Sequence, residues 1–230
     1  SATKGKEELY QVMLADSKKR AQEIRNRLYE LLGVAQQITF GEAAKIATWV
    51  GGQTGVRPAL LLAVLTQESK LGVNVGLCNR PGDPENKSWR KVMKASRDHE
   101  PFLAITKSLG MNPDITPVSC PMYDKQGNKI GFGGALGPAQ FIPSTWMGYT
   151  SKISAFTGKT PANPWDIRDA FIATALYLKN KGVASGCANA EWRAVLSFFA
   201  GSPDSTYRFY ADNVLAIARG YEDDLKTLGL

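Results

Sequence analysis

Apolar positions recur at helical spacing along most of this chain, and the runs are separated by glycine and proline. The most apolar run extends from Pro58 to Leu65. It belongs to a helix that Pro58 can begin, since a first helical turn tolerates proline, and that Gly72 would stop. Thr39 and Glu42 have capping-box spacing, and Gly51-Gly52 is expected to break the helix that they open. In addition to the Pro58 helix, the pattern predicts helices over about 40–50, 88–95, 100–109, 143–156, 163–182, 190–200 and 204–228.

Two segments differ from this pattern. From Met122 to Phe132, short alternating runs flank a turn that contains Gly127, which is typical of a β-hairpin. Residues 5–32 predict a long polar helix with a narrow apolar stripe, as in a short coiled-coil seam or a helix laid on a partner; packing on its own domain fits equally. We therefore expect a mainly α fold in two units: an N-terminal helical, coiled-coil-like segment over 1–36 and a globular domain over 37–230.

Glu68 lies close to the end of the most apolar helix. Apolar surroundings and the negative end of the helix dipole both disfavour a carboxylate, so this carboxyl group should keep its proton longer than usual. A general acid needs that property near neutral pH. The alternative is an exposed acid on the polar side of the helix, and this stretch alone does not decide between them.

Composition narrows the class of protein. The 230 residues are 43% hydrophobic, which fits one domain with a good core, and no apolar run reaches the ~18 residues that a membrane span needs. The net charge of +7 fits either a soluble basic surface or an anionic polymer partner: nucleic acid, a membrane face or the bacterial cell wall. The chain has no phosphate loop, zinc spacing or nucleic-acid motif, so we expect no cofactor, no metal and no nucleic-acid partner.

The three cysteines suggest a compartment. Cys78 and Cys120 lie in turn-rich stretches without a core of their own, and a disulfide between them would stabilise the fold by roughly 4 kcal/mol in the loop-entropy model. Cys187 would be left over. Such a bridge fits an extracytoplasmic protein of the periplasm, cell envelope or medium, whereas three unpaired thiols are the alternative.

Three stretches point to one chemistry: the helix end with Gln67-Glu68-Ser69, a Gly-rich segment over 134–144 (GALGPAQFIPS), and the aromatic stretch over 207–215 (YRFYADNVL). Together they resemble the lytic transglycosylases of bacterial cell walls, which have a lysozyme-like fold. The 134–144 segment is the most specific match, and it is most similar to the murein transglycosylase B branch. The resemblance covers about 55–220, with an unfamiliar insertion at about 78–122. Further matches are Asp169-Ala170 with Tyr177-Leu178, and Tyr210 with Val214.

The resemblance implies cleavage of the β-1,4 bond between N-acetylmuramic acid and N-acetylglucosamine in peptidoglycan, leaving a 1,6-anhydro sugar. Glycoside hydrolysis normally needs two carboxylates. One suffices here if the muramic acid 6-hydroxyl attacks intramolecularly, with Glu68 first as general acid and then as general base. Capping explains Asp166 and Asp169, so Asp124 of the hairpin is the reserve candidate for a second acid. A muramidase on the same fold and a non-catalytic peptidoglycan-binding module are the alternatives.

The side chains expected to bind glycan are Ser69, Gln140, Phe141 and Tyr210. Gln140 can hydrogen-bond sugar hydroxyls, and Ser69 can bond Glu68 or an acetamido oxygen unless it caps the helix. Tyr210 can steady Glu68 unless it is a core hydroxyl. The aromatic side chains can stack on sugar faces or belong to the core; these are Phe141, Trp146 and Tyr149.

The chain differs from the family in one sequence motif and has an N-terminal helix that the resemblance does not cover. Where the family has Tyr-Asn-Ala-Gly, this chain has Phe198-Phe199-Ala200-Gly201, which puts the sugar contact of that Asn in doubt. The N-terminal helix lies outside the resemblance. It can dock to a protein partner or cover the cleft until a partner removes it.

Overall fold

The computed structural model describes residues 38–183 and 187–230, together with Val12 and Asp16. Apart from Val12 and Asp16, the predicted helix over 5–32 and the proposed 1–36 unit lie outside the described residues. The described part is mainly helical with one two-stranded sheet, which confirms the predicted class. Its helices are α2 (Phe40–Thr54), α3 (Pro58–Ser69), α4 (Trp89–Val92), α5 (Ala95–Ser108), α6 (Pro143–Met147), α7 (Thr150–Thr157), α8 (Ile167–Asn180), α9 (Ala188–Ala200) and α10 (Arg208–Leu228), with single 3-10 turns η1 (Glu85–Lys87), η2 (Pro113–Ile115) and η3 (Ser205–Tyr207).

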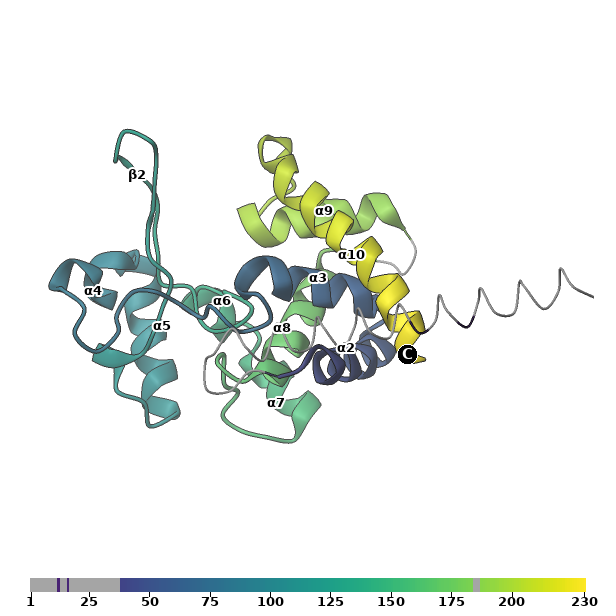
Figure 1. Cartoon of the computed structure of the whole chain (residues 1–230). Coiled ribbons are helices and arrows are strands. Elements are labelled where there is room, and N and C mark those ends of the chain that lie inside the picture. Colours follow the sequence, from purple (N-terminus) through teal and green to yellow (C-terminus); the bar gives the residue numbers. More distant parts are fainter. Residues whose placement is uncertain (1–11, 13–15, 17–37, 184–186) are drawn as a thin grey trace, which may run out of the picture.

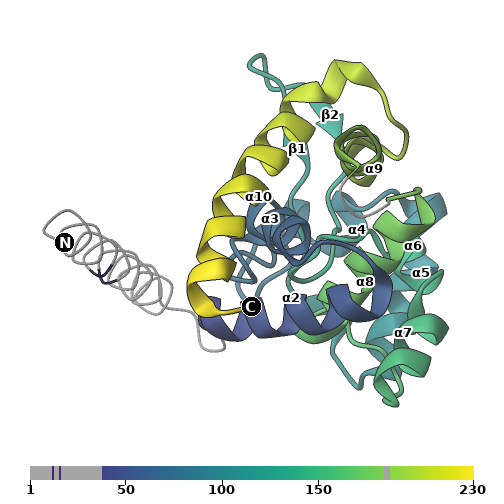
Figure 2. The ribbon, with the colours of Figure 1, turned by 90° about the vertical axis from the view of Figure 1, so that its right-hand side faces the viewer.

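Helix α3 is the buried axis of the fold. Its residues 59–65 are all at most 2% exposed, as expected for a helix that is apolar on every side. Helices α2, α8 and α10 pack around it, and Figure 2 shows α10 running along one side. At one end Arg57 bonds Glu222 of α10, and at the other Glu68 bonds Tyr210, so α10 is antiparallel to α3. The packing therefore leaves the C-terminal end of α3 beside the start of α10.

The capping box at the start of α2 is present, but Gly51-Gly52 does not break this helix. The helix continues to Thr54 and ends at Gly55, whose φ of 78° is left-handed. Gly51 instead permits a close approach, because a Cβ there would lie 2.7 Å from the carbonyl oxygen of Val56. The predicted end at about residue 50 was wrong because this glycine serves packing between α2 and the start of α3.

Three other predicted boundaries differ from the structure. Helix α5 begins at Ala95 and runs through Pro101, at the loss of one backbone hydrogen bond. The helix predicted over 88–95 is only the four-residue α4, since Met93 is extended. The helix predicted over 143–156 is two helices, α6 and α7, because the chain turns at Gly148.

The predicted hairpin is present, formed by β1 (Met122–Tyr123) and β2 (Lys129–Gly131) in antiparallel register. It stands away from the helical body in Figure 1. Two residues before β1, Cys120 forms the predicted disulfide with Cys78, while Cys187 is free and exposed. A backbone bridge between Cys78 and Val118 adds a second anchor, so the base of the hairpin is fixed although its tip is exposed.

At the N-terminal end of α3, an ion-pair network joins α3, α9 and α10. The Arg57 guanidinium contacts the buried Glu191 carboxylate of α9 through two hydrogen bonds, of 2.7 and 2.5 Å, and also bonds Glu222 of α10. Burial of Glu191 is offset by this bidentate pairing. The network therefore fixes α9 and α10 relative to α3. None of the helices over 38–183 and 187–230 has the length and apolar character that a membrane crossing requires.

Candidate active site

Glu68, the penultimate residue of α3, is the centre of the candidate site. Its side chain is partly buried, and its Oε1 accepts a hydrogen bond from the Tyr210 hydroxyl of α10. Burial raises the pKa of Glu68 to about 7, against the lowering effect of the Tyr210 bond. Because the shift comes from desolvation and not from a neighbouring carboxylate, Glu68 exchanges its proton near neutral pH as a single acid.

Tyr210 is placed to act only as a donor. It is 3% exposed, and burial together with the adjacent Glu68 raises its pKa well above the ordinary value. Its hydroxyl therefore stays protonated and directed at Glu68. One helical turn further along α10, the Asn213 side-chain amide donates to Oε1 of Gln67. Sequence reasoning missed this second link between α3 and α10, and the signal available for it was the run of polar residues that ends the apolar helix α3.

Ser69 does not face the open side of the site. It is 2% exposed, and its hydroxyl donates to the carbonyl oxygens of Leu65 and Pro138, at 3.2 and 2.6 Å, while it accepts from Gly72 N–H at 2.9 Å. Of the two roles that the sequence offered for Ser69, these contacts support the cap at the end of the helix and not a bond to Glu68 or to sugar. The hydroxyl joins the end of α3 to the Gly-rich segment and so holds that segment beside Glu68.

The Gly-rich segment forms a tight turn against the body of the protein. Gly137 has a φ of 58°, and a Cβ at this position would lie 1.9 Å from the carbonyl oxygen of Pro164, so only glycine fits. Gln140 is also left-handed, at φ 53°, and its side-chain amide donates to Gly137 O at 2.7 Å. The turn closes through Leu136 N–H and Phe141 O, at 2.9 Å. Gln140 is thereby held, partly exposed, in a fixed orientation.

Phe141 and Trp146 belong to the core. Phe141 is 5% exposed and Trp146 is 0% exposed, so the idea that Trp146 stacks on sugar is wrong. Phe141 lies in an aromatic cluster, with ring centroids 5.1–6.2 Å away, that supports the turn from behind; its other members are Trp146, Tyr149, Tyr177 and Phe198. Phe141 thus shapes the wall of the site from inside it.

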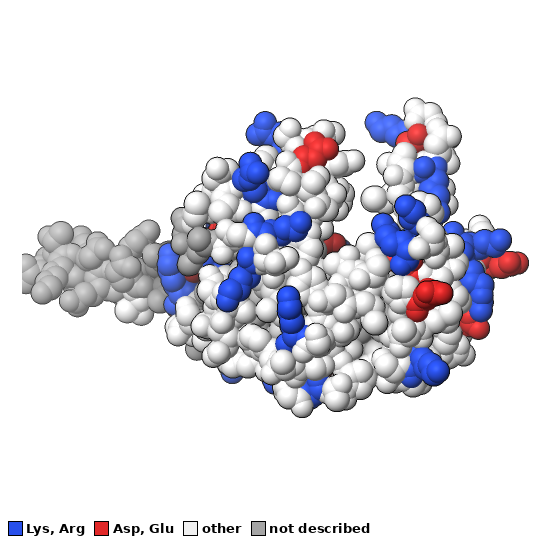
Figure 3. All heavy atoms as spheres, turned by 180° about the vertical axis from the view of Figure 1, so that it is seen from behind, with Lys and Arg blue, Asp and Glu red and all other residues white. Residues whose placement is uncertain are grey.

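A cleft opens between the hairpin and the end of the molecule formed by α9, η3 and α10, and Figure 3 shows it from behind. On the α9–α10 side, Phe199, Tyr207 and Phe209 are 38%, 39% and 61% exposed and touch one another. On the hairpin, Met122, Tyr123, Ile130 and Phe132 are each at least 50% exposed. Both sides therefore present apolar and aromatic surface to solvent, which the sequence suggested only through the density of aromatic residues around 198–210.

The remaining acids singled out from the sequence have other partners. Asp124 accepts from the backbone N–H groups of Gln126 and Asn128 and from the Asn128 amide, and these bonds lower its pKa. Asp166 caps α8, as predicted, and Asp169 accepts from Asn163 N–H at 2.8 Å. Asp124 therefore maintains the hairpin turn instead of holding a proton. Within the described ranges, no group of three or more His, Cys, Asp or Glu side chains is arranged to hold a metal ion.

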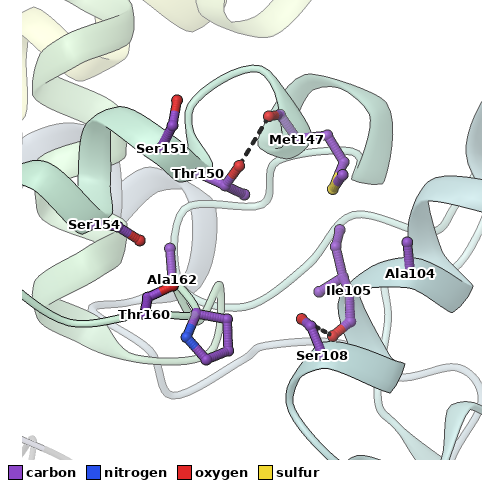
Figure 4. A pocket seen from close by; sticks show the side chains of 10 residues that line it. Ala104, Ile105, Ser108, Met147, Thr150, Ser151, Ser154, Thr160 and Ala162 are labelled. Atoms are coloured by element: carbon purple, nitrogen blue, oxygen red, sulfur yellow. Dashed lines mark hydrogen bonds between the residues drawn. The ribbon is translucent and has the colours of Figure 1, made fainter.

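A second hollow, of about 310 Å³, lies between α5, α6, α7 and the loop that follows α7 (Figure 4). Most of its hydroxyl groups lie on the side of α7 and the loop that follows, opposite Ala104 and Ile105 of α5, where Ser108 supplies a further hydroxyl. The hydroxyls of Ser108 and Thr150 already donate to carbonyl oxygens. Its lining contains no ionisable side chain, so it offers no acid or base; the residues are Ala104, Ile105, Ser108, Met147, Thr150, Ser151, Ser154, Thr160, Pro161 and Ala162.

Comparisons with known proteins give distant structural likenesses. No protein-family model matches the chain, and no curated protein matches it. Among solved structures it is similar to the soluble lytic transglycosylase SltB1 from Pseudomonas aeruginosa, with 20% identity and a TM-score of 0.45 over 63% of this chain and 45% of that one. It is also similar to Escherichia coli lytic transglycosylase Slt35 in complex with bulgecin A, with 20% identity and a TM-score of 0.40 over 72% of this chain and 50% of that one. The chain thus matches about half the length of these proteins, and at this identity the likeness assigns no side chain a role.

Proposed function

We propose that this protein is a lytic transglycosylase that cleaves the β-1,4 bond between N-acetylmuramic acid and N-acetylglucosamine in peptidoglycan. One observation carries the proposal: Glu68, a lone carboxyl group with a pKa near 7, sits against a buried tyrosine at the end of the buried helix. The motifs around Glu68 and over 134–144 add the substrate class by their resemblance to cell-wall transglycosylases. The disulfide fits the extracytoplasmic location where that substrate is found.

Glu68 alone can supply both proton transfers of this reaction. It donates its proton to the glycosidic oxygen as that bond breaks, and then, as a carboxylate, accepts the proton of the muramic acid 6-hydroxyl. The 6-hydroxyl attacks the anomeric carbon within the same sugar, so the product is a 1,6-anhydro ring and water is not consumed. A group with a pKa near 7 is suited to both directions, because its two forms are similar in free energy at neutral pH.

Tyr210 supports the second half of this cycle. Its hydroxyl donates to Glu68, and a hydrogen bond to an ionised acceptor is stronger than one to a neutral acceptor. The bond therefore stabilises the carboxylate after Glu68 has given up its proton, and it fixes which oxygen is engaged. In this proposal the other carboxylate oxygen, Oε2, carries out the proton transfers. Tyr210 is thus a partner of the catalytic acid and does not need to touch sugar.

The glycan is held in the cleft by the side chains that remain exposed. Gln140 has a fixed amide whose oxygen can accept from a sugar hydroxyl or acetamido N–H. Tyr207 and Phe209 offer ring faces of the kind on which sugars stack. Of the four binding residues expected from the sequence, Gln140 keeps a direct contact in this proposal. Ser69 and Phe141 act by shaping the turn that carries it.

Mass spectrometry of digested sacculi tests the proposal. Wild-type protein should release muropeptides that end in 1,6-anhydro-N-acetylmuramic acid, and Glu68→Gln should release none above background. Glu191→Gln is not a suitable control because Glu191 holds the fold, so Glu85→Gln, an exposed acid in η1, serves as the matched variant and should be fully active. Reducing muramic ends would indicate a muramidase instead. Sacculus binding without any soluble product would indicate a non-catalytic module.

A further inference from the structure

Phe199 contacts Tyr210 but has no role in the proposed mechanism. It lies in the last turn of α9 and stacks on Tyr210, with ring centroids 4.7 Å apart and planes inclined by 23°. Tyr210 is buried under it, while Phe199 itself is 38% exposed. The Phe199 ring therefore separates the tyrosine that contacts Glu68 from the solvent in the cleft.

The end of α9 is held so that Phe199 cannot easily leave this position. The neighbouring Phe198 packs on Phe141 and Tyr177, with centroids 5.1 and 5.2 Å away. The Tyr177 hydroxyl donates to Ser197 O at 2.6 Å. Successive residues on a helix point about 100° apart. Because Phe198 is anchored in the cluster around Phe141, Phe199 is directed toward Tyr210. The Phe198-Phe199 pair thereby connects the Gly-rich turn with the Tyr210–Glu68 pair.

We propose that Phe199 is a positioning residue for the catalytic acid: its ring excludes water from Tyr210 and keeps the tyrosine hydroxyl on Glu68. This inference rests on the proposed function for its effect on catalysis. Its geometric part, a ring that shields a buried acid–tyrosine pair, can be measured without any reaction. A side chain of similar polarity but without a ring would leave the face of Tyr210 open to solvent.

The groups around Glu68 set the direction of the expected change. Within the described residues, Tyr210 of α10 is the titratable partner that contacts Glu68; the turn over 136–141 and the last turn of α9 carry no ionisable side chain, and the next charged residue along the chain, Lys70, is exposed. Opening the site to water weakens desolvation, which lowers the pKa of Glu68, whereas a loosened Tyr210 bond raises it. Desolvation is the largest cause of the raised pKa of Glu68. We therefore expect the gain in hydration to outweigh the loosened bond, so that the pKa of Glu68 falls.

The test compares variants that keep the ring with variants that lose it. Phe199→Leu and Phe199→Met remove the ring, and Phe199→Tyr keeps it. Phe156→Leu is the control for loss of a ring elsewhere: Phe156 lies on α7, outside the cleft, and contacts the exposed Trp49 edge-to-face, with ring centroids 5.4 Å apart. Each variant is titrated by carbon NMR of its glutamate carboxyl groups, and the Glu68 signal is identified as the one missing from Glu68→Gln.

We expect Phe199→Leu and Phe199→Met to lower the Glu68 titration midpoint by about one pH unit, and Phe199→Tyr and Phe156→Leu to keep the wild-type midpoint. In digestion assays the alkaline limb of kcat should move down by the same amount, with KM changing less. An unchanged Glu68 midpoint in both ringless variants overturns the inference. If wild-type protein makes no glycan product, the proposed function fails, but the NMR midpoints still decide whether Phe199 controls Glu68.

Discussion

At the scale of single residues, the site depends on a carboxyl group that the fold holds in an unfavourable environment. Glu68 has its pKa raised to about 7 by burial, although each buried ionised group costs free energy of folding. Tyr210 reduces this cost but does not remove it. The arrangement is what a group needs if it must hold a proton at neutral pH and release it on demand. The same property makes Glu68 a source of instability at alkaline pH.

Replacing Glu68 with Gln should therefore stabilise the protein in a pH-dependent way. The folded pKa, about 7, lies above the value near 4.3 in the unfolded chain, so the folded state binds the proton more tightly. Stability is highest below the unfolded pKa and is lost as pH rises through 7. The gain from Glu68→Gln should be about 2.5 kcal/mol larger at pH 8 than at pH 5. Urea unfolding at both pH values measures it, and an equal gain at both would contradict the assigned pKa.

A second residue-scale prediction concerns Gly137. Gly137→Ala puts a Cβ into the carbonyl oxygen of Pro164, whereas Gly158→Ala adds one in open space at a similar left-handed φ of 70°. Gly158→Ala should cost about 1 kcal/mol for the backbone conformation alone. Gly137→Ala should cost at least ~3 kcal/mol, because the turn over 136–141 must also move. Thermal unfolding compares them; equal losses would mean that the turn has room to adjust.

At the scale of elements, the hairpin and its disulfide form an arm beside the cleft. The hairpin strands carry no buried side chain, so the arm takes its position from its base, where Cys78 and Cys120 are joined. The backbone bridge at Cys78 and Val118 lies in the same place. The base is thus the part of the arm on which both stability and the width of the cleft depend.

Removing the disulfide should destabilise the protein without changing Glu68. The variant with Cys78→Ser and Cys120→Ser should lose about 4 kcal/mol, the value that loop entropy gives for a closed loop of this size. Cys187→Ser should change nothing, because that thiol is free and exposed. Unfolding of each variant with and without reductant measures the loss. Wild-type stability that is insensitive to reductant would contradict the proposed contribution of this bridge.

Elements with local signals could be predicted from the sequence. The capping box at Thr39, the alternating pattern of the hairpin and the cap at Asp166 correctly predicted the start of α2, the hairpin and the start of α8. These signals act within a few residues of the chain. Gly51 could not be interpreted correctly, because its role comes from Val56 in the next segment. The contact of Tyr210 with Glu68 was one of two alternatives that the sequence offered for this tyrosine, while the stack of Phe199 on Tyr210 became visible only in three dimensions.

At the scale of the whole molecule, the cleft joins parts that are distant in the chain. The end of α3 forms its floor, residues 199–210 form one side and the hairpin forms the other. The packing of α10 on α3 and the bond from Tyr210 to Glu68 fix the first side relative to the floor. Lys and Arg side chains are scattered over both sides of the cleft and outnumber acidic ones on the face in Figure 3. The formal net charge is +7. This distribution suits a substrate whose peptide stems carry carboxylates.

Binding to sacculi should therefore weaken with salt. Using Glu68→Gln to prevent cleavage, we expect the affinity for sacculi to fall several-fold as NaCl is raised from about 50 to about 300 mM, since screening shortens the reach of surface charges. Binding of an uncharged chitin oligosaccharide, which meets only the cleft, should change little. Equal salt dependence of the two ligands would place the basic surface outside substrate recognition.

We propose that Glu68 acts as a single acid and base, with the substrate's own hydroxyl as nucleophile, and digestion in ¹⁸O-labelled water can show whether water takes part. Sacculi are digested by the wild-type protein in labelled water, and the new muramic acid ends are examined by mass spectrometry, with Glu68→Gln as the inactive reference. We expect anhydro ends that contain no label, because water does not enter the product. Ends that carry one labelled oxygen would contradict it, since they would show that water is the nucleophile.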